Sequence, residues 1–207
     1  MRVKFCGLRT AQDVKQAAEL DCDAVGFVFV DGSKRHVTLE QAQPLIALAK
    51  NLGVLTVALV ANTKASEITA IIEHCQPDVV QFHGFEDARF CEQFKHRYWK
   101  AIPMLNELEW QVVMNSHKNA ELFLLDNYGE HQSGGSGQTF DWFRFPAAES
   151  PRMILAGGLN ATNLDQAIAI TGAEFIDISS GIEVTPGVKS HAKMQQIMHI
   201  LTNLKQP

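Results

Sequence analysis

Short apolar runs alternate along the chain with longer stretches in which apolar residues recur every three or four positions. An unbroken apolar run of about five residues is typical of a strand buried on both faces, and the longer spacing is typical of an amphipathic helix. The predicted strands are Val3–Cys6, Ala24–Val30, Val54–Ala61, Val79–Phe82, Tyr98–Ile102, Leu122–Asp126, Met153–Ala156 and Phe175–Ile178. The predicted helices are Thr10–Leu20, Thr38–Lys50, Lys64–Cys75, Glu86–His96, Asn106–Ser116, Asn160–Ile170 and Lys189–Leu204.

Eight strands separated by helices predict a parallel sheet with crossover helices. Only the segment after the sixth strand is weak, because Phe140–Phe145 gives barely a turn or two. A closed barrel fits eight units better than an open sheet, and no Gly-x-Gly-x-x-Gly follows a strand. No linker divides the chain. Residues 1–207 are therefore expected to form one α/β domain, a (β/α)8 TIM barrel, near the lower size limit of about 200 residues for that fold.

Net charge, apolar run length and cysteine spacing limit which classes of partner and which cellular compartment are expected. With 18 basic and 23 acidic side chains the net charge is −5, which argues against nucleic acid as a partner. No apolar run approaches the ~18 residues of a membrane span, so no membrane partner is expected. The four cysteines form no CxxC pair and the chain opens directly on a strand pattern, which predicts a cytoplasmic protein with reduced thiols. The helices show no additional apolar stripe, so we expect a monomer rather than a homodimer.

Chemistry in such a barrel gathers where the strands end. Cys6, at the end of the first strand, could be a small buried hydrophobe or a reactive thiol. Asp126 follows the apolar run Leu122–Leu125, where the charged form of a carboxyl group is disfavoured, which suits a general acid; the alternative is an anchoring Asp. The loop after it, Asn127–Thr139, is rich in glycine and is either a lid or a plain connection.

Two consecutive loops have the composition of a phosphate site. Gly157 and Gly158 follow the seventh strand, and Ser179-Ser180-Gly181 follows the eighth. Glycine lets backbone N–H groups approach an anion closely, and barrels frequently bind phosphate between these two loops. We therefore predict phosphate binding by Gly157, Gly158, Ser179, Ser180 and Gly181, with a pair of ordinary turns as the alternative.

Other polar positions at the strand ends are candidates for substrate contacts. Arg35, in the loop after the second strand, could grip a carboxylate through its planar fork, or be a solvated loop charge. His83 could contact a ligand or be a structural histidine. We assign both, together with Gly7 and Asp177, to substrate binding.

Six motifs in this order resemble the phosphoribosylanthranilate isomerase family. They run through nearly the whole chain, and each alone would be weak. The motifs are Lys4-Phe5-Cys6-Gly7-Leu8, Gly26-Phe27-Val28-Phe29 with Ser33-Lys34-Arg35, Gln81-Phe82-His83-Gly84, Asp126 with Gly134-Gly135-Ser136-Gly137 and Phe140-Asp141-Trp142, Leu155-Ala156-Gly157-Gly158-Leu159, and Asp177-Ile178-Ser179-Ser180-Gly181-Ile182-Glu183 followed by Pro186-Gly187. Lys34 stands where the family usually has proline, which is expected to loosen the preorganisation of Arg35.

The resemblance implies an Amadori rearrangement of N-(5-phosphoribosyl)anthranilate, a small phosphorylated substrate, in tryptophan biosynthesis. It implies that Asp126 protonates the furanose ring oxygen, that Cys6 as thiolate removes the proton from C2, and that Arg35 holds the anthranilate carboxylate. Neither metal nor cofactor is implied. We expect Arg35 and nearby backbone donors to lower the pKa of the Cys6 thiol.

Two other functions remain open from the sequence. The histidine-pathway isomerase performs the same rearrangement, but it has an Asp where this chain has Cys6, and it holds a second phosphate in the opposite half of the barrel. A barrel that binds a phosphorylated ligand without turnover, with Cys6 as a redox sensor, is the third possibility. A protein of this last kind would bind the substrate and leave it unchanged, so turnover of the anthranilate substrate by purified protein is the test.

Overall fold

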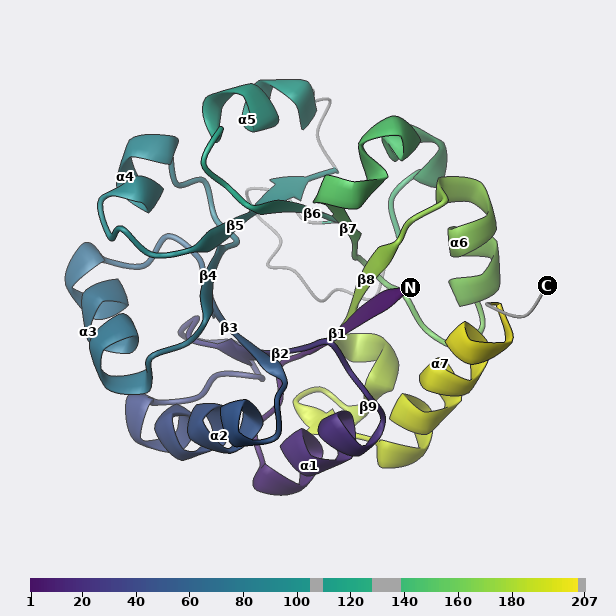
Figure 1. Cartoon of the computed structure of the whole chain (residues 1–207), viewed down its shortest axis with the longest axis horizontal. Coiled ribbons are helices and arrows are strands. Elements are labelled where there is room, and N and C mark those ends of the chain that lie inside the picture. Colours follow the sequence, from purple (N-terminus) through teal and green to yellow (C-terminus); the bar gives the residue numbers. More distant parts are fainter. Residues whose placement is uncertain (105–109, 128–138, 205–207) are drawn as a thin grey trace.

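A computed structural model describes residues 1–104, 110–127 and 139–204 of the chain. Eight parallel strands close into a barrel in sequence order, and the helices form a ring outside it (Figure 1). The predicted α/β barrel is thus confirmed. The barrel strands are β1 (Arg2–Cys6), β2 (Ala24–Val28), β3 (Leu55–Val60), β4 (Val79–Phe82), β5 (Tyr98–Pro103), β6 (Leu122–Asp126), β7 (Met153–Leu155) and β8 (Phe175–Ile178).

The helices follow the predicted spacing over most of the chain. They are α1 (Ala11–Glu19), α2 (Leu39–Asn51), α3 (Ala65–Cys75), α4 (Ala88–Glu92), α5 (Trp110–Ser116), α6 (Leu164–Thr171) and α7 (His191–Asn203). Side chains cap several of them: Thr38 and Gln41 form a capping box at α2, and Ser190 accepts a hydrogen bond from the Lys193 backbone N–H at α7. Among the described residues no helix is long and apolar enough to cross a membrane.

The segment after β4 differs from the prediction, whereas the segment after β6 is as weakly helical as expected. The fourth helix is much shorter than Glu86–His96, since it begins after its N-cap Asp87 and ends at Glu92. Between β6 and β7 lie two 3₁₀ turns, η1 (Trp142–Arg144) and η2 (Ala147–Arg152), where Pro146 and Pro151 lack the N–H that a longer helix needs.

After β8 the chain adds elements that were not predicted. These are a 3₁₀ turn, η3 (Ser180–Ile182), and an antiparallel hairpin of β9 (Glu183–Thr185) and β10 (Val188–Lys189).

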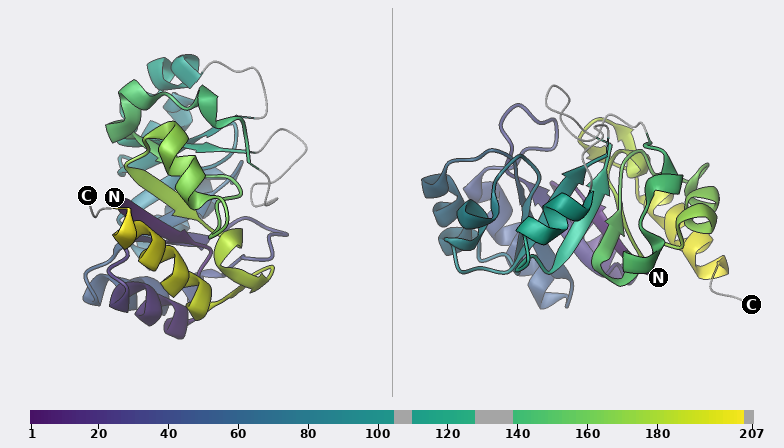
Figure 2. Two further views of the ribbon diagram at one scale, coloured as in Figure 1. Left: turned by 90° about the vertical axis from the view of Figure 1, so that its right-hand side faces the viewer. Right: turned by 90° about the horizontal axis from the view of Figure 1, so that it is seen from above.

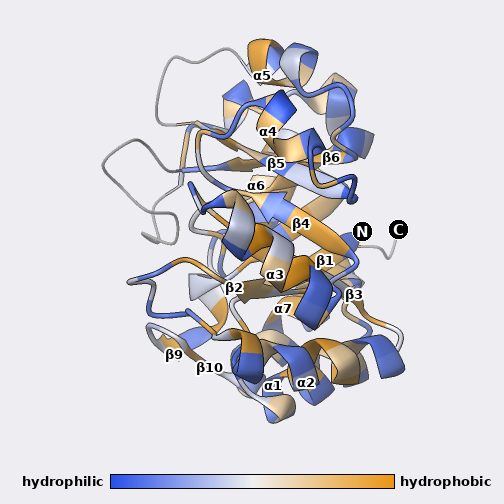
Figure 3. Cartoon of the chain, turned by 90° about the vertical axis from the view of Figure 1, so that its left-hand side faces the viewer, coloured by the Kyte–Doolittle hydropathy of each residue, from blue (hydrophilic) through white to orange (hydrophobic). Residues whose placement is uncertain are grey.

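Alternation along each strand divides the side chains between two cores. Val3 and Phe5 of β1 face the helices and belong to the large outer core, whereas Lys4 and Cys6 face the barrel interior. Lower in the interior, Trp99 packs edge-on against Phe175 with ring centroids 5.7 Å apart, within a small apolar cluster. In Figure 3 the barrel strands are largely hydrophobic, whereas the surrounding helices mix hydrophilic and hydrophobic residues. Polar groups on β1 thus project into the upper interior.

The barrel closes where the first and last strands pair. β1 and β8 are parallel neighbours, with Lys4 in register with Asp177. The N-terminus and the end of α7 lie at the end of the barrel where the strands begin (Figure 2). The C-terminal strand ends, and the loops that follow them, therefore form the opposite face. That face is where barrels of this kind carry their sites.

Candidate active site

The Cys6 thiol lies inside the barrel beside a buried ion pair. Lys4 Nζ donates a hydrogen bond to Asp177 Oδ2 at 2.9 Å, and the two side chains are 0% and 8% exposed. Gly26 on β2 leaves room for this group, because a Cβ there would stand 2.8 Å from Cys6 Sγ and 3.2 Å from Lys4 Nζ. A thiol, an ammonium and a carboxylate therefore share one enclosed space.

These groups shift one another's proton affinity. Burial raises the pKa of the Cys6 thiol; the Lys4 ammonium opposes that rise, the Asp177 carboxylate adds to it, and Lys189 opposes it. Burial alone would lower the pKa of Lys4, but the charges of Asp177 and Cys6 hold it above its ordinary value. The expectation that Arg35 lowers the thiol pKa is wrong. Burial outweighs the nearby cations, and those cations are the two lysines.

Asp126, at the end of β6, is buried and contacts His83. The His83 Nε2 atom lies 3.2 Å from Asp126 Oδ2, and Gln81 Nε2 lies 2.9 Å from His83 Nδ1. Since the Gln81 amide donates to Nδ1, the ring proton is on Nε2 and faces the carboxylate. The histidine whose role the sequence left open therefore lies against the predicted acid, and Gln81 fixes its tautomer.

The loops after β7 and β8 touch each other and the predicted acid. Gly157 and Gly158 have φ angles of 83° and 65°, which favour glycine. A Cβ on Gly157 would stand 2.9 Å from Asp126 Oδ1, and a Cβ on Gly181 would overlap the Leu159 carbonyl oxygen. Both glycines are therefore required for this close packing.

A pocket of about 370 Å³ opens between these two loops and α7. Gly158, Ser180 and Gly181 line it together with Lys193 of α7. Ser179 is engaged elsewhere, because its hydroxyl donates to the main-chain oxygen of Cys6 at 3.0 Å. Three of the five predicted phosphate residues thus line one cavity, while Gly157 and Ser179 connect it to the acid and the thiol.

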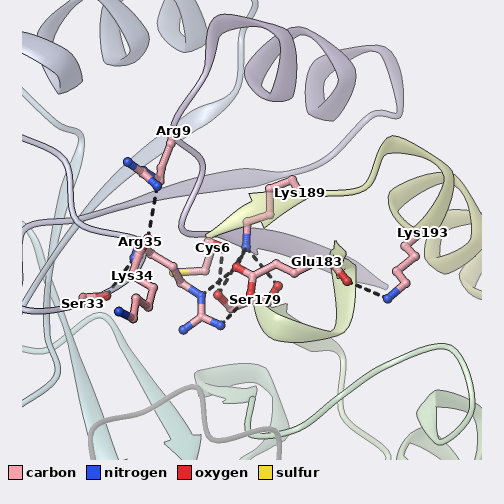
Figure 4. Close-up of polar contacts among 9 residues, drawn as sticks. All are labelled: Cys6, Arg9, Ser33, Lys34, Arg35, Ser179, Glu183, Lys189 and Lys193. Carbon is pink, nitrogen blue, oxygen red and sulfur yellow. Dashed lines mark hydrogen bonds and ion pairs between the residues drawn. The ribbon is translucent and has the colours of Figure 1, made fainter. Parts of the chain in front are cut away.

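Arg35 does not extend alone from its loop. Its Nε and Nη2 atoms each donate to the Glu183 carboxylate at 2.8 Å, and Glu183 Oε1 also accepts from Lys189 Nζ at 2.8 Å (Figure 4). Lys189 Nζ donates further to the Ser179 carbonyl oxygen at 3.0 Å. Burial would raise the pKa of Glu183, but these hydrogen bonds hold it below its ordinary range. A continuous polar network thus joins Arg35 to the strand that carries Cys6.

The loop that carries Arg35 is anchored on both sides. A Cβ on Gly7, whose φ is 77°, would stand 2.7 Å from Arg35 Cδ, so Gly7 makes room for the arginine stem. The Lys34 carbonyl accepts from Arg9 at 3.2 Å, and a Cβ on Gly187 would overlap it. The loosening expected from Lys34 in place of proline is therefore offset by contacts to the chain on either side.

Sequence reasoning gave no role to Lys4, Glu183 or Lys189. The position of Lys4 could have been predicted, because residues two apart in a strand lie on the same face. Lys4 is two positions before Cys6, so it must point into the barrel when Cys6 does. The partners of Glu183 and Lys189 depend on the hairpin that the sequence analysis missed. The glycine-rich part of the predicted lid, residues 133–137, lies outside the described residues.

The closed barrel, with a buried thiol and a carboxylate at the C-terminal ends of its strands, places the chain in the class of (β/α)8-barrel proteins with an acid–base site. The family model for N-(5'-phosphoribosyl)anthranilate (PRA) isomerase matches residues 3–199. The chain belongs to this phosphoribosylanthranilate isomerase family, and it is an intramolecular aldose–ketose isomerase of tryptophan biosynthesis. It converts PRA to 1-(2-carboxyphenylamino)-1-deoxyribulose 5-phosphate.

Several relatives match over nearly the whole chain. The N-(5'-phosphoribosyl)anthranilate isomerase of Xylella fastidiosa strain 9a5c is 39% identical, over 95% of this chain and 90% of its own. A structure of monomers generated from the dimeric isomerase of Thermotoga maritima superposes with a TM-score of 0.83 at 29% identity, covering 98% and 99% of the two chains. An isomerase in complex with reduced 1-(o-carboxyphenylamino)-1-deoxyribulose 5-phosphate gives 0.80 at 27% identity, covering 98% and 99%.

Proposed function

We propose that Asp126 is the general acid and Cys6 the general base of this rearrangement. The reaction needs one group that gives a proton to the ring oxygen and another that takes the proton from C2. The single observation that carries the assignment is that a buried thiol beside Lys4 and a carboxylate beside His83 project into one barrel from the ends of β1 and β6.

The acid acts first. Asp126 gives its proton to the furanose ring oxygen, the bond from that oxygen to C1 breaks, and the amine lone pair forms the C=N bond of an iminium. The carboxylate left behind accepts a hydrogen bond from His83 Nε2, 3.2 Å away, which is stronger to the charged than to the neutral form. His83 thus lies where it can stabilise the negative charge that develops on Asp126 as the proton leaves.

The base acts second. Cys6, as thiolate, removes the proton from C2, the electrons of that bond form the C1=C2 bond, and the iminium nitrogen regains its lone pair. The enolamine then tautomerises to the ketone. Since burial raises the pKa of Cys6, the thiolate needs positive charge nearby, and Lys4, Lys189 and the iminium supply it. The iminium is the electron sink, so the scheme uses no metal or cofactor.

Binding is divided between the two halves of the barrel mouth. Arg35 holds the anthranilate carboxylate as a charge-assisted pair. The predicted glycines and serines after β7 and β8 bind the phosphate around the 370 Å³ pocket, where Gly158 is one lining residue. Asp177 Oδ1 is buried and has no hydrogen-bond partner among the described residues, so it can accept from a sugar hydroxyl. His83 and Gly7 border the substrate beside the acid and Arg35.

Two variants test the acid and the base. Cys6→Ser and Asp126→Asn are each expected to lower kcat by about 10²–10⁴-fold, the usual scale for a general acid or base. Binding of the reduced product analogue, measured by calorimetry, is expected to change little. Cys75→Ser, which alters a buried thiol on α3 outside the barrel, is the control and should retain turnover. Near-normal turnover in Cys6→Ser would leave that cysteine a buried hydrophobe.

The assembly and compartment remain part of the proposal. We infer a cytoplasmic monomer with reduced thiols, whose partner is its substrate rather than nucleic acid or membrane. The net charge of −5 supports the lack of a nucleic-acid partner, and the four free cysteines support a reducing compartment. The relative from Thermotoga maritima is dimeric, so the alternative is a homodimer. Light scattering at micromolar concentration should give the 23.0 kDa mass of one chain, and twice that mass would refute the monomer.

A further inference from the structure

Glu183 holds one particular edge of the Arg35 guanidinium. A guanidinium has five N–H donors in a rigid plane. Glu183 takes the edge formed by Nε and Nη2, at 2.8 Å for both contacts. The other edge, formed by Nη1 and the outer hydrogen of Nη2, has no hydrogen bond to any described residue. Arg35 therefore has one edge fixed and a second edge able to receive another carboxylate.

Glu183 is itself fixed by a buried cation. Lys189 Nζ lies 2.8 Å from Glu183 Oε1, and its side chain is 0% exposed. The same ammonium donates to the Ser179 carbonyl, and the Ser179 hydroxyl donates to the Cys6 carbonyl. The Glu183 carboxylate is thus tied to the strand that ends at the thiol.

The three groups Arg35, Glu183 and Lys189 together carry a net positive charge. Arg35 and Lys189 bring two positive charges to the one Glu183 carboxylate. Three hydrogen bonds hold that carboxylate, two from Arg35 and one from Lys189, so we expect it to stay on Arg35 when an anion arrives. A substrate carboxylate would neutralise the remaining charge at the unoccupied edge of Arg35.

We propose that Glu183, anchored by Lys189, is the positioning residue that orients Arg35 for the anthranilate carboxylate. This inference rests on the proposed role of Arg35 as the carboxylate-binding residue. Glu183 does not touch the substrate; it removes the rotational freedom of the arginine, so that the fork meets the carboxylate already aligned. It therefore sets the preference for carboxylated substrates over otherwise identical ones.

The test compares two ligands that differ only in that carboxylate. One is the reduced product analogue, and the other is the same molecule with phenylamino in place of carboxyphenylamino. Calorimetry gives a dissociation constant for each, and their ratio measures carboxylate recognition. In Glu183→Gln the carboxylated ligand should bind about tenfold more weakly or worse, because one acceptor oxygen and the charge are lost. The ligand without the carboxylate should change by less than about twofold, the margin expected when its contacts are untouched.

The chain offers a matched control for this variant. Glu121 accepts from Arg97 Nε and Nη2 at 2.6 and 3.1 Å, the same paired geometry, near the opposite end of the barrel. Glu121→Gln should leave the ratio unchanged. Should Glu183→Gln fail to fold, Glu183→Asp keeps the charge but is one methylene shorter, and the same loss of ratio is expected from it.

Each outcome decides between the two proposals. The positioning role is supported if the preference for the carboxylated ligand falls in both Arg35→Met and Glu183→Gln and falls no further in the double variant. An unchanged ratio in Arg35→Met refutes Arg35 as the carboxylate-binding residue itself. A ratio lost in Arg35→Met but kept in Glu183→Gln overturns only the role of Glu183. Tighter binding of the carboxylated ligand in Glu183→Gln would mean that Glu183 competes with the substrate, and equal weakening of both ligands would mean a merely structural role; either overturns the inference.

Discussion

Replacing Lys4 with methionine should damage both the stability of the barrel and the ionisation of its thiol. Lys4 is fully buried, and its ammonium lies 2.9 Å from Asp177, which is 8% exposed. Removing one member of a buried ion pair leaves an uncompensated charge and destabilises a protein by about 3–5 kcal/mol. We expect a loss of this size in urea unfolding, and recovery of most of it in Lys4→Met/Asp177→Asn, where neither charge remains.

The same substitution should move the pH dependence of turnover. Lys4 is the strongest influence that opposes the rise in the pKa of Cys6. A neighbouring opposite charge shifts a pKa by about one to three units, and the thiolate fraction at neutral pH falls about tenfold for each unit. Lys4→Met should therefore lose about 10- to 10³-fold in kcat at pH 7. It should regain part of the loss as the pH rises, because the alkaline solution restores the thiolate.

The assay is kcat from pH 6 to pH 10 for folded Lys4→Met and for the wild type. Lys15→Met, which removes an exposed lysine of α1, is the control for loss of charge alone and should keep the wild-type profile. A Lys4→Met profile of wild-type shape, in protein that unfolds at the expected lower urea concentration, would refute the electrostatic role and leave Lys4 as a structural partner of Asp177.

Three further outcomes follow from the geometry. Gly26→Ala should lower kcat more than tenfold with little change in KM, because its Cβ would stand 2.8 Å from Cys6 Sγ; an unchanged kcat would show that the thiol has room to move. Gly158→Val, at φ 65°, should raise KM and weaken competition by inorganic phosphate, since a β-branched residue is strained there and blocks the backbone. Burial raises the pKa of Cys22 to about 12, whereas a cysteine in the unfolded chain has a pKa of ~8.5. Between these two pH values only the unfolded chain loses the Cys22 proton. The contribution of Cys22 to the free energy of unfolding should therefore fall by up to about 1.4 kcal/mol per pH unit. Urea unfolding at pH 8 and pH 10 checks this, and Cys22→Ala should show a shallower fall.

The barrel could be predicted because its strands are buried on both faces. The run Leu122–Leu125, for example, is apolar, and the polar residue Asp126 follows it at the end of the strand. A polar residue in that position marks the catalytic face of the barrel. That logic gave Cys6 and Asp126 directly. The hairpin β9–β10 escaped prediction because its strands have three and two residues, too short for any period to show.

The partners of the site residues were harder to predict than the residues themselves. Arg35 and Glu183 are 148 residues apart, and Lys4 and Asp177 are 173 apart. No local pattern relates such positions; only the closure of the barrel and the path of the last hairpin bring them together. A charged side chain considered alone in a loop is usually solvated, so no local pattern indicated that Arg35 pairs with Glu183.

The seam between β1 and β8 makes the working site a late product of synthesis. A nascent chain that has emerged only as far as β7 already contains Lys4, which belongs in the barrel interior. It still lacks Asp177, the carboxylate that pairs with Lys4, because β8 follows β7 in the chain. Such a chain can form local βα units, but it cannot bury Lys4 at low cost or present an activated thiol. Turnover therefore requires the closed barrel, and only molecules in which β1 has paired with β8 contribute to catalysis.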